Sequence, residues 1–145
     1  MIVYFDASAL VKRHLHEVGT EDVVQLSDEL TSAGTSLISR AEVSAAIARS
    51  ARLGAISVEA AEAALTDFRR HWLSLFRVRV DETTVARADA LAWEFGLRGY
   101  DAVHLASALT WREAIAESPL FATFDRALGK AARTQGLDVW PESLE

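Results

Sequence analysis

The chain has 145 residues, half of them hydrophobic, which suits one folded domain over residues 1–145 and excludes a disordered tail. It has no cysteine, which excludes disulfides and thiolate metal sites, and no apolar stretch near the roughly 20 residues of a transmembrane helix, so we expect a cytoplasmic protein without membrane contact. The formal net charge of −6 argues against broad, nonspecific nucleic-acid binding, and leaves room for a local basic patch or a basic partner protein.

Short apolar runs alternate along the chain with longer segments of helical periodicity. The runs predict strands at residues 1–5, 35–38, 76–80, 120–124 and 137–140. The segments between them predict helices at residues 8–14, 21–30, 40–53, 57–73, 81 or 83 to 95, 102–116 and 126–135, with a loop at 31–34. This alternation favours a three-layer α/β/α fold with a central parallel sheet of about five short strands.

Acidic residues follow the apolar runs at four places. Asp6, Asp101 and Asp125 each end such a run, and Glu42 comes just after another. If the runs are parallel strands, their carboxyl ends meet at one edge of the sheet, where α/β proteins place their sites. Carboxylates gathered there repel one another, and a divalent cation is the usual way to hold them together. The pattern therefore points toward metal-dependent chemistry.

A purely structural interpretation stays open for each of these positions. Asp6, Asp101 and Asp125 each precede a predicted helix and can cap its N-terminus. Glu42 lies three residues after Ser39, which is the spacing of a capping box. A capping aspartate can also bind a metal, so the two interpretations do not exclude each other.

The histidines and arginines carry less information. His104 lies three residues after Asp101 on the same face of its predicted helix, and we interpret it, like the other histidines, as a packing or surface residue. Arg40, Arg98 and Arg126 adjoin or nearly adjoin a candidate ligand, where the phosphate backbone of a nucleic acid would pass.

Four segments that contain these residues resemble the motifs of PIN-domain proteins of the VapC toxin type. They are residues 4–12, 39–43, 100–108 and 123–128, and they occur in the expected order over nearly the whole chain. The resemblance implies an endoribonuclease that depends on Mg²⁺ or Mn²⁺. It maps an acidic site onto the chain, with two supporting hydroxyls: Asp6, Glu42, Asp101 and Asp125, with Ser8 and Thr123.

Within that site we expect Asp6 and Asp101 to be the principal metal ligands. Glu42 and Asp125 would bind the metal directly or through water, or would orient the attacking water.

The resemblance also implies partners. Toxins of this type are neutralised by a cognate antitoxin and commonly form homodimers. The antitoxin would lie in a groove between the predicted helices 40–53 and 58–73, with a basic side chain against the carboxylates. Two other classes stay open, namely a catalytically silent PIN-like module that binds RNA or protein, and a structural domain whose aspartates are only caps.

Overall fold

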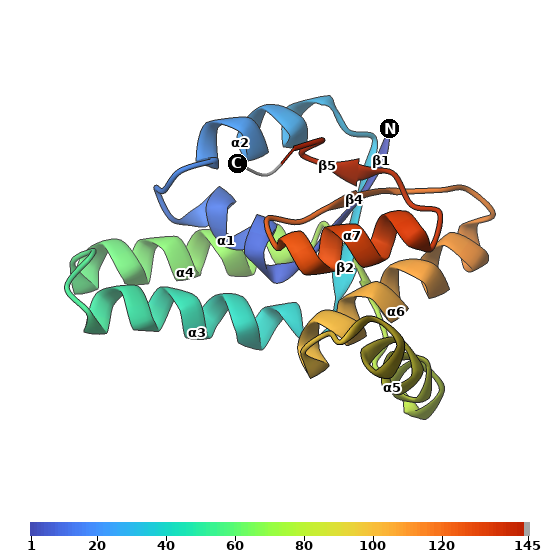
Figure 1. Ribbon diagram of the computed structural model, residues 1–145. Helices are drawn as coiled ribbons and strands as arrows, with labels where there is room; N and C mark the ends of the chain where they lie inside the picture. Colours follow the sequence, from blue (N-terminus) through green and yellow to red (C-terminus); the bar gives the residue numbers. More distant parts are fainter. Residues whose placement is uncertain (144–145) are drawn as a thin grey trace.

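The protein, described here for residues 1–143 from a computed structural model, has a central sheet of five parallel strands (Figure 1). The strands are β1 (Ile2–Phe5), β2 (Ser32–Ser36), β3 (Phe76–Val78), β4 (Leu120–Ala122) and β5 (Val139–Trp140). Their order across the sheet is β3-β2-β1-β4-β5, so β1 is the central strand. The chain reverses its direction of travel across the sheet between β1 and β4, where open α/β sheets form a crevice beyond the strand ends.

Seven helices within the described residues cover the two faces of this sheet. They are α1 (Ala7–His14), α2 (Thr20–Glu29), α3 (Ser39–Arg52), α4 (Val58–Trp72), α5 (Glu82–Phe95), α6 (Gly99–Ile115) and α7 (Arg126–Thr134). Helices α3 and α4 form a hairpin that projects from the body of the molecule in Figure 1. The predicted three-layer α/β/α fold is therefore confirmed.

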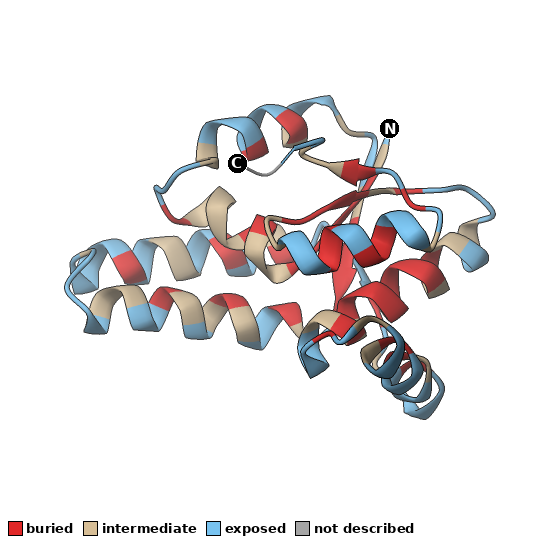
Figure 2. Ribbon diagram, in the orientation of Figure 1, coloured by how far each residue is buried: buried red, intermediate tan, exposed pale blue. Residues whose placement is uncertain are grey.

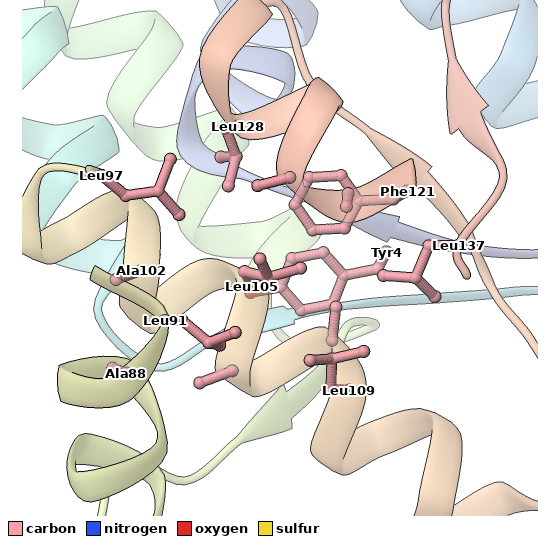
Figure 3. Close-up of a cluster of buried hydrophobic side chains, with 14 of the residues drawn as sticks. Tyr4, Ala88, Leu91, Leu97, Ala102, Leu105, Leu109, Phe121, Leu128 and Leu137 are labelled. Atoms are coloured by element: carbon pink, nitrogen blue, oxygen red, sulfur yellow. The ribbon is translucent and has the colours of Figure 1, made fainter. Parts of the chain in front are cut away.

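Strand β1 separates two hydrophobic clusters, because successive side chains of a strand point to opposite faces. Val3 and Phe5 belong to a cluster with the buried residues of α1 to α4, whereas Tyr4 belongs to a cluster with α5, α6 and α7. Figure 2 shows the buried residues concentrated along β1, β4 and α6. In Figure 3 the Tyr4 ring lies among Leu105 and Leu109 of α6 and Phe121 of β4. The end of β1, and with it Asp6, the next residue, is thus fixed by packing on both faces of the sheet.

The largest error in the predicted elements concerns β2. Residues 32–34 were expected to form a loop, but they belong to the strand, and Gly34 pairs with Tyr4 of β1. A Cβ atom at Gly34 would lie 2.7 Å from the ring of Trp111 in α6. Glycine is therefore required by the close approach of this helix and does not mark a turn.

Other boundaries shift by a few residues. Helix α6 begins at Gly99, three residues before the predicted start, and β3 and β4 end at Val78 and Ala122, two residues early. Among residues 1–143, no helix has the combined length and apolar character needed to cross a membrane.

Candidate active site

Asp6 follows β1 directly and is almost completely buried, with 3% of its surface exposed. Its Oδ1 accepts hydrogen bonds from the Ala9 backbone N–H at 2.9 Å and from the Ser8 hydroxyl at 2.6 Å. Its Oδ2 accepts a hydrogen bond from the Thr123 hydroxyl at 2.5 Å. Asp6 therefore caps α1, as the structural interpretation predicted, and at the same time lies at the carboxyl edge of the sheet.

Burial acts strongly on this carboxyl group. Loss of solvation raises the pKa of Asp6, while the imidazole of His104 and the hydrogen bonds from Ser8, Thr123 and Ala9 act in the opposite direction. A buried carboxylate that keeps several donors is a favourable ligand for a cation, which would replace the lost solvation.

Thr123 connects Asp6 to Asp125. Its hydroxyl donates to Asp6 and accepts a hydrogen bond from the Asp125 backbone N–H at 3.0 Å. Ser8 makes a similar bridge, because its hydroxyl accepts from the Phe124 backbone N–H at 3.0 Å. These two hydroxyls fix the segment after β4 against the start of α1.

Asp125 and Asp101 share one arginine. Asp125 caps α7 through a 2.8 Å hydrogen bond from the Leu128 N–H to its Oδ1, and its Oδ2 accepts from a terminal nitrogen of Arg98 at 3.2 Å. The Nε of the same guanidinium donates to Asp101 at 2.9 Å. Arg98 itself is highly exposed, with 80% of its side chain accessible. A positive charge thus already lies between two of the predicted ligands.

The capping interpretation of Asp101 is wrong. Asp101 does not cap α6, because the helix starts at Gly99 and its N-cap, Arg98, makes no side-chain capping bond. Asp101 lies in the first turn of α6 and is carried to the carboxyl edge by that helix. Residues 97–101 form the end of the loop after α5 and the first turn of α6.

The capping box predicted for Glu42 is also wrong. Helix α3 has Ile38 at its N-cap, and Ser39 lies inside the helix with its hydroxyl bonded to that of Thr35 at 2.6 Å. Glu42 instead bonds the Nε2 of His104 at 2.7 Å. The Nδ1 of His104 bonds the Tyr4 hydroxyl at 2.9 Å. A phenol that donates to Nδ1 leaves the proton on Nε2, which then donates to the Glu42 carboxylate.

The structure therefore brings the four predicted carboxylates to one edge of the sheet. Thr123 links Asp6 to Asp125, Arg98 links Asp125 to Asp101, and Asp101 lines the same cavity as Glu42. Arg40 and Arg126 are exposed at the starts of α3 and α7, beside this edge.

The carboxylates are not arranged as a complete metal-binding site. Within residues 1–143, no three His, Asp or Glu side chains are close enough together to hold a metal ion. The donor set nevertheless fits a hard divalent cation, because it consists of carboxylate oxygens and two hydroxyls. The guanidinium of Arg98 stands between Asp101 and Asp125 as a cation would.

Tyr4 and His104 were not predicted as part of the site. The interpretation of His104 as a packing residue was incomplete: it is buried, as expected, but it also connects Glu42 to the core. Its position one helical turn after Asp101 was the only signal in the sequence.

A family model, described as the PIN domain, matches residues 3–134. The chain therefore belongs to the PIN-domain family. This match covers all four carboxylates and both supporting hydroxyls.

Within that family the chain is similar to a ribonuclease of Mycobacterium tuberculosis named VapC45, with 37% identity over 99% of this chain and 98% of the relative. The resemblance to VapC-type proteins is thus confirmed at the level of sequence.

Solved structures agree on the fold. The structure described as FitAB bound to an IR36 DNA fragment gives a TM-score of 0.69 at 22% identity, covering 100% of this chain and 98% of that one. A toxin–antitoxin complex from Klebsiella pneumoniae gives 0.63 at 18% identity, covering 85% and 86%.

Proposed function

We propose that this protein is a metal-dependent endoribonuclease of the VapC toxin type, which hydrolyses RNA phosphodiester bonds and is neutralised by a cognate antitoxin. The observation that carries the proposal is the connected set of four carboxylates at the carboxyl edge, in a chain 37% identical to a ribonuclease of the same family. The residues concerned span the chain from Asp6 to Asp125, which fits a single domain over residues 1–145.

Mg²⁺ or Mn²⁺ would be held by Asp6 and Asp101, with Glu42 and Asp125 binding directly or through water. When bound, such a cation binds a phosphate oxygen, lowers the pKa of a bound water and offsets charge in the transition state. Ser8 and Thr123 keep Asp6 in one orientation, since both hydroxyls donate to its carboxylate. His104 does the same for Glu42, because it is itself fixed by Tyr4.

Arg98 exchanges partners during this chemistry. Its guanidinium neutralises Asp101 and Asp125 when no divalent cation is bound. With a cation held by these carboxylates, the exposed guanidinium of Arg98 would be free to bind an RNA phosphate. Arg40 and Arg126 extend the same basic margin along the starts of α3 and α7, so that a strand of RNA crosses the acidic edge between positive charges.

The partners follow from the same resemblance. An antitoxin would bind along the hairpin of α3 and α4 and place a basic side chain near the carboxylates, in the position that Arg98 takes here. The net charge of −6 suits a basic partner. The protein would form a homodimer and act in the cytoplasm on cellular RNA.

The direct test is incubation of the purified protein, free of antitoxin, with total cellular RNA in Mg²⁺, Mn²⁺ or EDTA. Discrete cleavage that needs the metal and disappears in both Asp6→Asn and Asp101→Asn supports the proposal. Intact RNA in every lane, with all proteins equally folded by circular dichroism, contradicts it and favours a silent binding module.

A further inference from the structure

A cavity of about 550 Å³ opens between α5 and α6, directly beside the acidic edge. Its walls are mostly apolar and come from the two helices: Val85, Ala88 and Ala92 of α5, with Tyr100 and Val103 of α6. Its size falls within the roughly 300–1,000 Å³ that is usual for small-molecule sites. The cavity therefore has the size and the lining of a ligand site.

The cavity is continuous with the candidate active site. Glu42, Asp101 and Arg98 also line it, and Arg98 is the residue that bridges Asp101 and Asp125. An occupant would thus have an apolar body between α5 and α6 and a charged end at the acidic edge. A nucleotide has this form, with a flat base joined through ribose to a phosphate.

Tyr100 supplies an aromatic surface at this place. Tyr100 directly precedes Asp101 and lines the cavity, and 68% of its surface is exposed. Aromatic side chains that stay exposed beside a phosphate-binding site commonly stack on the bases of single-stranded nucleic acid, with roughly 1–3 kcal/mol per base.

We propose that this cavity binds the RNA base next to the cleaved phosphate, with Tyr100 as its stacking partner. The proposal rests on the ribonuclease function and adds a subsite to it. The α5 wall also carries Asp89, whose carboxylate accepts N–H donors from the edge of the base. Guanine offers two such donors side by side, so it is the preferred base.

The charges around the cavity make this binding depend on the divalent cation. Glu42, Asp89 and Asp101 all line the cavity and repel a phosphate, whereas Arg98 is the one basic residue among the described residues that line it. Nucleotides should therefore bind weakly in EDTA and more tightly with Mg²⁺, because a cation held by the carboxylates would offset their repulsion of the phosphate.

The experiment is a titration with the four nucleoside 5′-monophosphates, followed by NMR of the methyl groups of Val85, Ala88 and Val103. Ribose 5-phosphate is the matched probe, since it carries the sugar and phosphate without a base. We expect Mg²⁺-dependent shifts of these methyl signals with the nucleotides, largest with the guanine nucleotide, and clearly smaller shifts with ribose 5-phosphate.

Three variants connect the signal to Tyr100. Tyr100→Ala should weaken nucleotide binding by about tenfold, whereas Tyr100→Phe should keep it, because stacking needs the ring and not the hydroxyl. Trp93→Ala is the control, since Trp93 is an aromatic residue of the same helix as Val85 that is 91% exposed and does not line the cavity. Equal effects of Tyr100→Ala and Trp93→Ala would overturn the proposal.

The outcomes separate this proposal from the ribonuclease function. A protein that cleaves RNA but shows no base-dependent shift overturns the base subsite alone. A protein that binds the bases but cleaves no RNA with any cation overturns the ribonuclease function and leaves a nucleotide-binding cavity. Shifts that follow protein concentration, with no effect of nucleotide, overturn the subsite and assign the cavity to a contact between two copies of the chain.

Discussion

The two halves of the acidic site differ in how firmly the protein holds them. Asp6 is buried and receives hydrogen bonds from a backbone N–H and two hydroxyls of its own chain. The side chains of Asp101 and Asp125 are 17% and 27% exposed, and they share the solvent-exposed Arg98. Asp6 is thus preorganised by the protein core. Asp101 and Asp125 are held by the exposed side chain of Arg98, which a ligand can replace.

This difference indicates a division of roles. A carboxylate that cannot move is suited to fix the position of a cation, since preorganised groups need no rearrangement during the reaction. Carboxylates neutralised by an exposed arginine are suited to exchange that partner for a cation, because exposed ion pairs contribute only about 0–1 kcal/mol. Substitutions in the two halves should therefore have different consequences.

The largest effect is expected in the buried half. Asp6→Asn should reduce RNA cleavage on the order of a hundredfold or more, because it removes the charge of a preorganised group. The fold should survive, since asparagine caps a helix about as well as aspartate. Cleavage rates with Mg²⁺ and thermal unfolding of the same samples measure both effects.

Asp81→Asn is the matched control for this substitution. Asp81 caps α5 through a 2.9 Å hydrogen bond from the Thr84 N–H, as Asp6 caps α1, but it lies outside the acidic site. It should keep full activity. If both variants lost activity equally, or if neither did, the role of Asp6 would reduce to capping.

The next largest effect is expected at His104, which connects the core to Glu42. His104→Ala should reduce activity by about 10–100-fold, as is usual when the partner that orients a ligand is removed. The loss should appear in kcat and in Mn²⁺ affinity, with little change in KM for RNA.

Tyr4→Phe separates orientation from packing at the same place. It keeps the ring in the core and removes only the hydroxyl that bonds His104. Its effect on activity should have the same direction as that of His104→Ala and be smaller. Full activity of His104→Ala at unchanged Mn²⁺ affinity would exclude a positioning role.

Much of this arrangement could be predicted from the sequence, for identifiable reasons. Short apolar runs that predict strands alternate with longer segments that predict helices. The fold class and the strand-to-helix junctions at Asp6 and Asp125 therefore follow from local patterns. Whether a junction aspartate only caps or also takes part in a site depends on which junctions meet in space. Here the sheet order brings the ends of β1 and β4 together, with Phe5 paired to Ala122.

The parts that failed depend on contacts between residues far apart in the chain. Glu42 bonds His104, which is 62 positions away, in preference to the Ser39 predicted to be its capping partner. Gly34 is a strand residue because Trp111 packs against it. No local pattern distinguishes these cases, because the capping box and the glycine turn are both favourable locally.

The exposed half of the site should respond through metal binding. Arg98→Ala should increase the affinity for Mn²⁺ several-fold, because Asp101 and Asp125 then repel each other without a competing cation. The same variant should weaken RNA binding. Isothermal titration calorimetry with Mn²⁺ measures the first effect. Titration with a short RNA measures the second, with Asp6→Asn added to each protein so that the RNA is not cleaved.

Arg126→Ala provides the comparison. Arg126 is exposed beside Asp125 but does not bridge the carboxylates. It should weaken RNA binding without changing Mn²⁺ affinity. If Arg98→Ala lowered Mn²⁺ affinity, or if both arginine variants changed it equally, the exchange of partners at Arg98 would be wrong.

The smallest effect concerns a second ionisable cluster, which is partly buried and serves as a reference outside the acidic site. His14 bonds Asp67 at 3.0 Å and His71 at 3.2 Å, between α1 and α4. Burial lowers the pKa of His71 from 6.5 to about 4, with the positive charges of Arg13 and His14 acting in the same direction and Asp67 against them.

Stability should therefore decrease as the pH falls from 6.5 toward 4, because the unfolded chain binds a proton at His71 in this window and the folded chain does not. We expect a decrease of about 1–2 kcal/mol after allowing for partial exposure. Urea unfolding at several pH values measures it. His71→Gln should flatten the dependence, and His16→Gln, at an exposed position, should not. An unchanged slope in His71→Gln would assign the pH dependence to other groups, with His14, whose pKa burial also lowers, as the first to test by the same method.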